Sequence, residues 1–217
     1  HPHASRIEAT LTTEAFGVGQ LRADILTDIE DQDLLIIAIR GSANNGNWLA
    51  NIDARKVNST ILISTDGSDQ AQVHAGFARA SETITPAIQE AIPAGKRVII
   101  TGHSLGAAIA LFVAPRLVQA GITVDRVVTF GCPRVGDANY LTDWTDLVGP
   151  VAHRYVNGPD PVCQLPTPLR GFRHIGKLHW HSYQGDALQA GAWMRFGNRL
   201  GAYWHAWRNP GADLIGY

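Results

Sequence analysis

A serine flanked by two glycines is the residue in this sequence whose type and surroundings best fit covalent catalysis. The pentapeptide Gly-His-Ser-Leu-Gly at 102–106 follows β-branched residues at 98–101 and precedes an alanine-rich stretch with helical spacing. This order of strand, tight turn and helix is the context that a nucleophile elbow requires, with the glycines leaving room for strand and helix to approach. We interpret Ser104 as a nucleophile; a glycine-rich turn that holds an ordinary serine is the alternative interpretation.

A serine hydroxyl needs a base to remove its proton, and that base is normally a histidine oriented by a carboxylate. After a nucleophile elbow the acid comes next in the chain and the histidine last. Asp160 directly follows a predicted strand, in a turn stiffened by Pro159 and Pro161. Asp137 lies several residues beyond another predicted strand and is the second candidate. An aspartate that only caps its own turn is the alternative interpretation for Asp160.

Several histidines could serve as the base. Those that follow Asp160 are His174, His179, His181 and His205. The first two alternate with apolar residues in a predicted strand, which favours structural roles. We favour His205 over His181, because the tryptophans around His205 could shield an ion pair. His103, beside the nucleophile, is predicted to point into the scaffold.

Ester hydrolysis also needs hydrogen-bond donors aimed at the oxyanion of the tetrahedral intermediate. The backbone N–H of Leu105, directly after the nucleophile, is one predicted donor. Ser42 follows the apolar run at 34–39 and could supply both its N–H and its hydroxyl. A simple turn serine is the alternative interpretation for Ser42.

Apolar runs that alternate with helical patterns predict an α/β fold with a mostly parallel sheet and helices on both faces. Residues 1–20 show no clear periodicity. Pro86 and Pro115 are expected to bend or break the helices that contain them, and Gly121 is expected to cap the second. The predicted strands are 21–27, 34–39, 57–64, 98–101, 124–130, 151–156 and, as an edge or hairpin strand, 172–180. The predicted helices are 48–52, 73–92, 107–120 and 188–207.

The length of 217 residues fits one domain spanning 1–217, and the net charge of -1 gives no electrostatic case for binding nucleic acid or an anionic membrane.

Two cysteines, Cys132 and Cys163, exclude a disulfide-dense scaffold without deciding their redox state. No apolar run is long enough to span a bilayer. A first residue other than methionine and the acceptor pattern Asn58-Ser59-Thr60 favour a secreted protein. Oligomeric state stays open.

Several separate motifs together resemble the class 3 lipases, the fungal-type lipase family within the α/β-hydrolases. The similarity extends from about residue 34 to residue 160. The motifs are the predicted oxyanion strand and lid at 39–42 and 47–51, a helix entry at 73–77, the elbow at 101–106, the segment 129–136, the acid turn at 157–162 and a neighbouring strand at 172–176.

The resemblance implies the α/β-hydrolase fold and hydrolysis of lipid (acylglycerol) esters through an acyl-enzyme, without a metal or organic cofactor. It implies Ser104 as nucleophile, Asp160 as acid, and Ser42 with Leu105 as the oxyanion hole. Residues 43–53 would form a flap whose apolar members could meet a lipid–water interface. Their polar content leaves a phospholipase or an esterase for soluble esters, such as feruloyl esters, as alternatives. A non-catalytic binding module is the alternative from another class.

Overall fold

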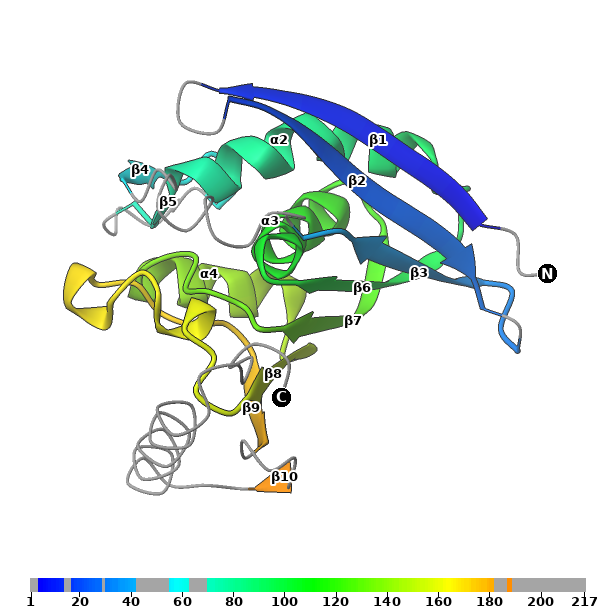
Figure 1. Ribbon diagram of the computed structural model, residues 1–217. Helices are drawn as coiled ribbons and strands as arrows, with labels where there is room; N and C mark the ends of the chain where they lie inside the picture. The colour runs from blue at the N-terminus through cyan, green and yellow to red at the C-terminus, as the bar shows by residue number, and fades with distance from the viewer. Residues whose placement is uncertain are drawn as a thin grey trace, which may run out of the picture.

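A mixed β-sheet forms the centre of the computed structural model, which describes residues 4–13, 17–28, 30–41, 55–62, 70–181 and 187–188 (Figure 1). The strand order is β1-β2-β3-β6-β7-β8-β9-β10. Strands β3, β6, β7, β8 and β9 pair in parallel, whereas the β1–β2, β2–β3 and β9–β10 pairs are antiparallel. The bounds are β1 Ala4–Thr13, β2 Gly17–Thr27, β3 Leu34–Ile39, β6 Arg97–His103, β7 Thr123–Phe130, β8 Ala152–Asn157, β9 Lys177–His181 and β10 Ala187–Leu188. The predicted mostly parallel sheet is therefore confirmed.

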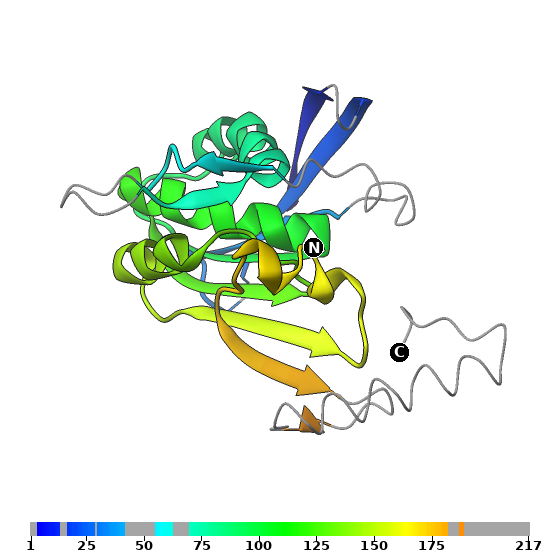
Figure 2. The same cartoon turned by 90° about the vertical axis from the view of Figure 1, so that its left-hand side faces the viewer.

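Three α-helices form a layer on one face of this sheet: α2 (Ala75–Glu90), α3 (Leu105–Gln119) and α4 (Ala138–Val148) (Figure 2). Residues of the parallel strands that face this layer are fully buried, such as Ile37 and Ile100, both 0% exposed. Their strand neighbours are half-buried. The sequence predicted helices on both faces of the sheet. The α-helices of the described residues lie on this one face.

Smaller elements surround the sheet. A two-stranded sheet, β4 (Lys56–Asn58) with β5 (Gln72–His74), lies beside α2, and two short 3₁₀-helices, η1 (Val162–Gln164) and η2 (Pro168–Arg170), follow β8. Within the part of the chain that the structure describes, no helix has the length and apolar character needed to cross a membrane.

The sequence-based interpretation of the N-terminus was wrong. The absence of periodicity over 1–20 gave no strand, yet β1 and β2 form a long antiparallel pair that runs from Ala4 opposite Leu26 to Thr13 opposite Gly17. β1 is an edge strand in which Ile7, Ala9 and Leu11 alternate with charged residues and threonines. This alternation is the pattern typical of a half-buried strand, so the signal was present in the sequence and the interpretation of residues 1–20 missed it.

Two predicted strands are shorter than expected. Within 57–62, the described part of the strand predicted over 57–64, only residues 57 and 58 are in a strand, β4. The chain then turns, because the Ser59 hydroxyl accepts hydrogen bonds from the amides of Ile61 (3.2 Å) and Leu62 (3.0 Å). The strand predicted over 172–180 begins only at Lys177 and pairs in parallel with β8. The predicted helices 48–52 and 188–207 lie outside the described residues, apart from Leu188 in β10.

Pro86 lies inside the continuous helix α2 and Pro115 inside α3, so of the two expected outcomes, a bend or a break, the break does not occur. Pro115 lacks the N–H that would bind the carbonyl of Leu111. Two side chains of α4 donate to that carbonyl instead: the Tyr140 hydroxyl at 3.2 Å and the Trp144 indole Nε1 at 2.8 Å. The predicted cap is confirmed, since Gly121 follows α3 with φ of 81°.

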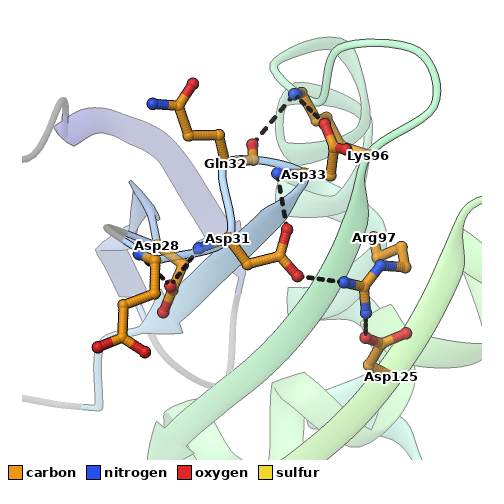
Figure 3. Close-up of polar contacts among 8 residues, drawn as sticks. Asp28, Asp31, Gln32, Asp33, Lys96, Arg97 and Asp125 are labelled. Atoms are coloured by element: carbon orange, nitrogen blue, oxygen red, sulfur yellow. Dashed lines mark hydrogen bonds and ion pairs between the residues drawn. The ribbon is translucent and has the colours of Figure 1, made fainter.

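A network of ion pairs ties the starts of the parallel strands together (Figure 3). The Arg97 guanidinium at the start of β6 pairs with Asp31, in the turn before β3, and with Asp125 in β7. Lys96 pairs with Asp33 at 2.8 Å. This network occupies the end of the sheet opposite the turn that carries Ser104.

Candidate active site

The sharp turn between β6 and α3 has the geometry of a nucleophile elbow. Ser104 adopts φ of 56° and ψ of −119°, and among the described residues it is the one non-glycine with positive φ. Its amide donates to the Phe130 carbonyl at 2.9 Å. A Cβ on Gly106 would lie 2.2 Å from the Ile39 carbonyl oxygen, and one on Gly102 would lie 2.5 Å from the Gly106 backbone. The two glycines of the motif are therefore required by close backbone approach, as predicted.

The Ser104 side chain is 2% exposed, and its hydroxyl has no hydrogen-bond partner within the part of the chain that the structure describes. Ser104 stands at the N-cap of α3, and Leu105 is the first residue of that helix. First-turn amides of a helix have no intrahelical acceptor, and the helix dipole there favours negative charge. The Leu105 amide is thus a suitable oxyanion donor.

Asp160 lies in the turn after β8, at the same edge of the sheet as Ser104. Its Oδ1 accepts from the Val162 amide at 2.9 Å, and its Oδ2 accepts from the Cys163 thiol at 3.6 Å. A Cβ on Gly131 would lie 2.8 Å from Oδ2 of Asp160 and 3.2 Å from Nε2 of His103. The carboxylate therefore lies against the C-terminal end of β7, close to His103, the residue that precedes Ser104.

Further contacts hold the turn that carries the acid. Nε2 of His174 lies 3.1 Å from the Cys163 carbonyl oxygen and, since a carbonyl only accepts, must donate to it. Burial, followed by the charges of Arg154 and Arg134, lowers the pKa of His174 to about 2. His174 is thus a neutral structural residue, as expected. Nη1 of Arg134 also donates to the carbonyls of Gln164 (2.7 Å) and Pro166 (2.9 Å).

The second acid candidate, Asp137, has a different use. It is the N-cap of α4, where its Oδ1 accepts from the Tyr140 amide at 3.0 Å. Its Oδ2 accepts from the Gln72 amide at 3.2 Å. Both carboxylate oxygens thus satisfy backbone donors, which is a structural role.

The histidines of β9 differ in their surroundings. His179 lies 2.9 Å from His153 between ring nitrogens and stacks on Tyr155 at 4.6 Å, which supports a structural role. His181 ends β9, half-buried, and its carbonyl accepts from the Gly158 amide at 2.9 Å, so it lies beside the acid turn. The prediction for His103 was wrong: its ring is exposed, because strand alternation turns it to the face without α3. His205 and Ser42 lie outside the described residues.

Both cysteines are buried free thiols. Burial raises the pKa of Cys132 to about 12, and burial followed by the charge of Asp160 raises the pKa of Cys163. The contact between Cys163 and Asp160 was missed from sequence, although the cysteine three residues after the acid was the available signal. Among the described residues, no group of three or more His, Cys, Asp or Glu side chains could hold a metal ion.

Comparison with known proteins adds independent information. A family model described as lipase (class 3) matches residues 36–169. The secreted mono- and diacylglycerol lipase 1 of Fusarium solani is 32% identical over 173 residues, covering 76% of this chain and 47% of the relative. A lipase of Rhizomucor miehei is 31% identical over 165 residues, covering 70% of this chain and 42% of the relative.

Among solved structures, the Rhizomucor miehei lipase propeptide complex matches with a TM-score of 0.66 and 25% identity. The match covers 83% of this chain and 59% of that one. This chain therefore spans about half the length of the curated relatives it matches.

Proposed function

Because this chain belongs to the class 3 lipase family and has the α/β-hydrolase fold, we propose that it is a serine carboxylester hydrolase acting on lipid (acylglycerol) esters. The observation that carries the proposal is Ser104, held with φ of 56° between β6 and α3 with its hydroxyl free of described partners. A strained backbone at a buried nucleophile is typical of a residue kept for chemistry.

In the proposed reaction, Ser104 attacks the ester carbonyl carbon while the base accepts the hydroxyl proton. His205 is proposed as that base, with Asp160 orienting its imidazole and stabilising the cation. The oxyanion is stabilised by the Leu105 amide and by Ser42. The alcohol leaves with the proton from the imidazolium, and water then hydrolyses the acyl-enzyme with the same imidazole as base.

The support for these roles is unequal. For Asp160 it is the carboxylate beside Gly131 with donors on both oxygens. For Leu105 it is the position at the start of α3. For His205 and Ser42 it is chain order and the family resemblance. His181 stays the alternative base, because the end of β9 lies beside the acid turn.

Replacement of the nucleophile is the direct test. Ser104→Ala is expected to lower kcat for 4-nitrophenyl butyrate by a factor of about 10⁴ or more and to abolish labelling by a fluorophosphonate. Ser81→Ala is the matched control, because Ser81 is also fully buried but donates only to the Ala78 carbonyl within α2. Substantial turnover by Ser104→Ala would contradict the proposal, and absence of labelling in the unmodified protein would favour a binding module.

The base is identified by comparing two single variants. His205→Ala is expected to remove activity, whereas His181→Ala is expected to retain most of it. The opposite result would assign the base to His181. Circular dichroism of both variants shows whether a loss of activity reflects a loss of fold.

Acylglycerols are the proposed substrates because the Fusarium solani relative is named as a mono- and diacylglycerol lipase. Emulsified acylglycerols, phosphatidylcholine vesicles and methyl ferulate separate lipase, phospholipase and feruloyl-esterase activity. A jump in rate with a short-chain ester above its solubility limit would support action at a lipid–water interface.

Secretion is proposed on two grounds. The Fusarium solani relative is named as secreted, and Asn58 of the acceptor pattern is exposed at the end of β4. Recovery of active protein from the medium of a host that expresses the full natural gene would support secretion, and retention inside the cells would contradict it.

A further inference from the structure

The two carboxylate oxygens of Asp160 are held by donors of different kinds. The donor to Oδ1 is a backbone amide, Val162 N, at 2.9 Å. The donor to Oδ2 is a side chain, the Cys163 thiol, at 3.6 Å between sulfur and oxygen. A thiol donates over longer distances than an amide and is weaker, yet its direction still matters for a carboxylate that must aim at an imidazole.

From this arrangement we infer that Cys163 is a positioning residue of the proposed reaction: its thiol fixes the rotation of the Asp160 carboxylate, so that Oδ2 keeps a lone pair for the imidazole of the base. The inference rests on the proposed function. It assigns Cys163 no direct contact with substrate.

The thiol is well prepared to act as a fixed donor. Cys163 is 3% exposed and not in a disulfide, and burial together with the negative charge of Asp160 keeps it protonated by raising its pKa. Its own backbone is anchored, because His174 donates to its carbonyl at 3.1 Å. On the side of Oδ2 toward β7, Gly131 leaves no room for a side chain. The carboxylate therefore has a donor on each oxygen and backbone packed against one of them.

The other buried cysteine provides a matched control. Cys132 is 0% exposed, and its thiol lies 3.3 Å from the Pro133 carbonyl. Cys132→Ala therefore removes a buried thiol of the same size without removing a donor to the acid.

Activity measurements on four variants test the inference. Cys163→Ala and Cys163→Val, the second of which fills the space without a donor, are expected to lower kcat about five- to ten-fold and to change KM less than two-fold, since one hydrogen bond is lost. Cys163→Ser keeps a donor and is expected to retain at least half of kcat. Cys132→Ala is expected to retain full kcat even where its melting temperature falls as much as that of Cys163→Ala.

A double-mutant cycle excludes a merely structural effect. In an Asp160→Asn background the carboxylate is gone, so Cys163→Val should not change the residual kcat further. An additional five-fold loss in that background, equal kcat for Cys163→Ser and Cys163→Val, or unchanged kcat in Cys163→Val would each overturn the role of the thiol. Absence of ester hydrolysis in the unmodified protein would instead overturn the proposed function, and with it this inference.

Discussion

The indole Nε1 of Trp144 donates a 2.8 Å hydrogen bond to the backbone carbonyl of Leu111, one turn before Pro115 in α3. A proline frees this carbonyl because it lacks the N–H that the helix would supply four residues later. Tyr140 donates to the same oxygen at 3.2 Å, and both aromatic side chains are fully buried in α4. Side chains of α4 thus replace the hydrogen bond to the Leu111 carbonyl that α3 cannot make. The helix that begins directly after the nucleophile therefore continues to Gln119.

Trp144→Phe is therefore expected to lower the free energy of unfolding by about 2 kcal/mol, from the lost donor and the smaller ring. Urea denaturation at pH 7.5 measures the loss. Pro115→Ala restores the helical N–H, so the same tryptophan replacement should cost about 1 kcal/mol less in that background. Equal costs in both backgrounds would show that the indole does not substitute for the missing helical donor.

Arg97 joins two carboxylates at the opposite end of the sheet, and its removal should affect stability without affecting catalysis. The side chains of Arg97, Asp31 and Asp125 are 40%, 43% and 27% exposed, so their ion pairs are partly screened by solvent. We expect Arg97→Met to lower the free energy of unfolding by about 1 kcal/mol at low salt and by less in 1 M NaCl. Denaturation at both salt concentrations measures the difference. A loss of kcat without a loss of stability would contradict the expectation that the ion pairs of Arg97 stabilise the fold without affecting the catalytic end of the sheet.

The local signals of the candidate site could be predicted from the sequence. The elbow at Ser104 depends on glycines two residues before and two residues after it, and Asp160 follows its strand within a few residues. Both are patterns of neighbouring residues. For the same reason the buried parallel strands were found from continuous apolar runs.

What could not be predicted depends on partners distant in the chain. β1 is an exception, because it pairs with the next strand along the chain and its alternation of Ile7, Ala9 and Leu11 with polar residues is a local signal that was missed. The continuity of α3 past Pro115 depends on hydrogen-bond donors from α4. The local effect of proline on a helix gives no information about such donors from another helix. The exposure of His103 depends on which face of the sheet the helices cover. The contacts of Gly131 with Asp160 likewise join segments that only the fold brings together.

His174 should make the protein less stable in acid. Its pKa is lowered from 6.5 to about 2 in the folded state, chiefly by burial, so the unfolded chain binds the proton more readily. Stability is therefore highest above pH 6.5 and falls as the pH drops from 6.5 toward 2, by about 1.4 kcal/mol per pH unit. The pKa of His153 is also lowered, by burial first and by the charge of His179 next, and acts in the same direction.

Unfolding of the unmodified protein and of His174→Gln at pH 7.5 and pH 5.5 measures this effect. Glutamine keeps an N–H for the Cys163 carbonyl and cannot titrate. The variant is expected to lose about 1.4 kcal/mol less than the unmodified protein between the two pH values. An identical loss in both proteins would mean that His174 is already protonated, or already exposed, in the folded state.

Gly131 tests whether the position of the acid controls the rate. Its φ is 56°, and a Cβ there would lie 2.8 Å from Oδ2 of Asp160, closer than real Cβ contacts allow. Gly131→Ala must therefore push the carboxylate away from its position as well as strain the backbone by about 1 kcal/mol. A displaced acid no longer aligns with the imidazole, so kcat is expected to fall by about ten-fold or more, with KM changed little.

Gly121→Ala separates the effect of backbone strain from the effect of displacing the Asp160 carboxylate. Gly121 has φ of 81°, and a Cβ there would meet nothing within 4 Å, so alanine strains the backbone without touching a side chain. Both variants are expected to lose a similar amount of free energy of unfolding, but only Gly131→Ala should lose kcat. If the two variants hydrolyse esters equally well, the carboxylate of Asp160 tolerates displacement, and its proposed alignment with the base does not limit the reaction.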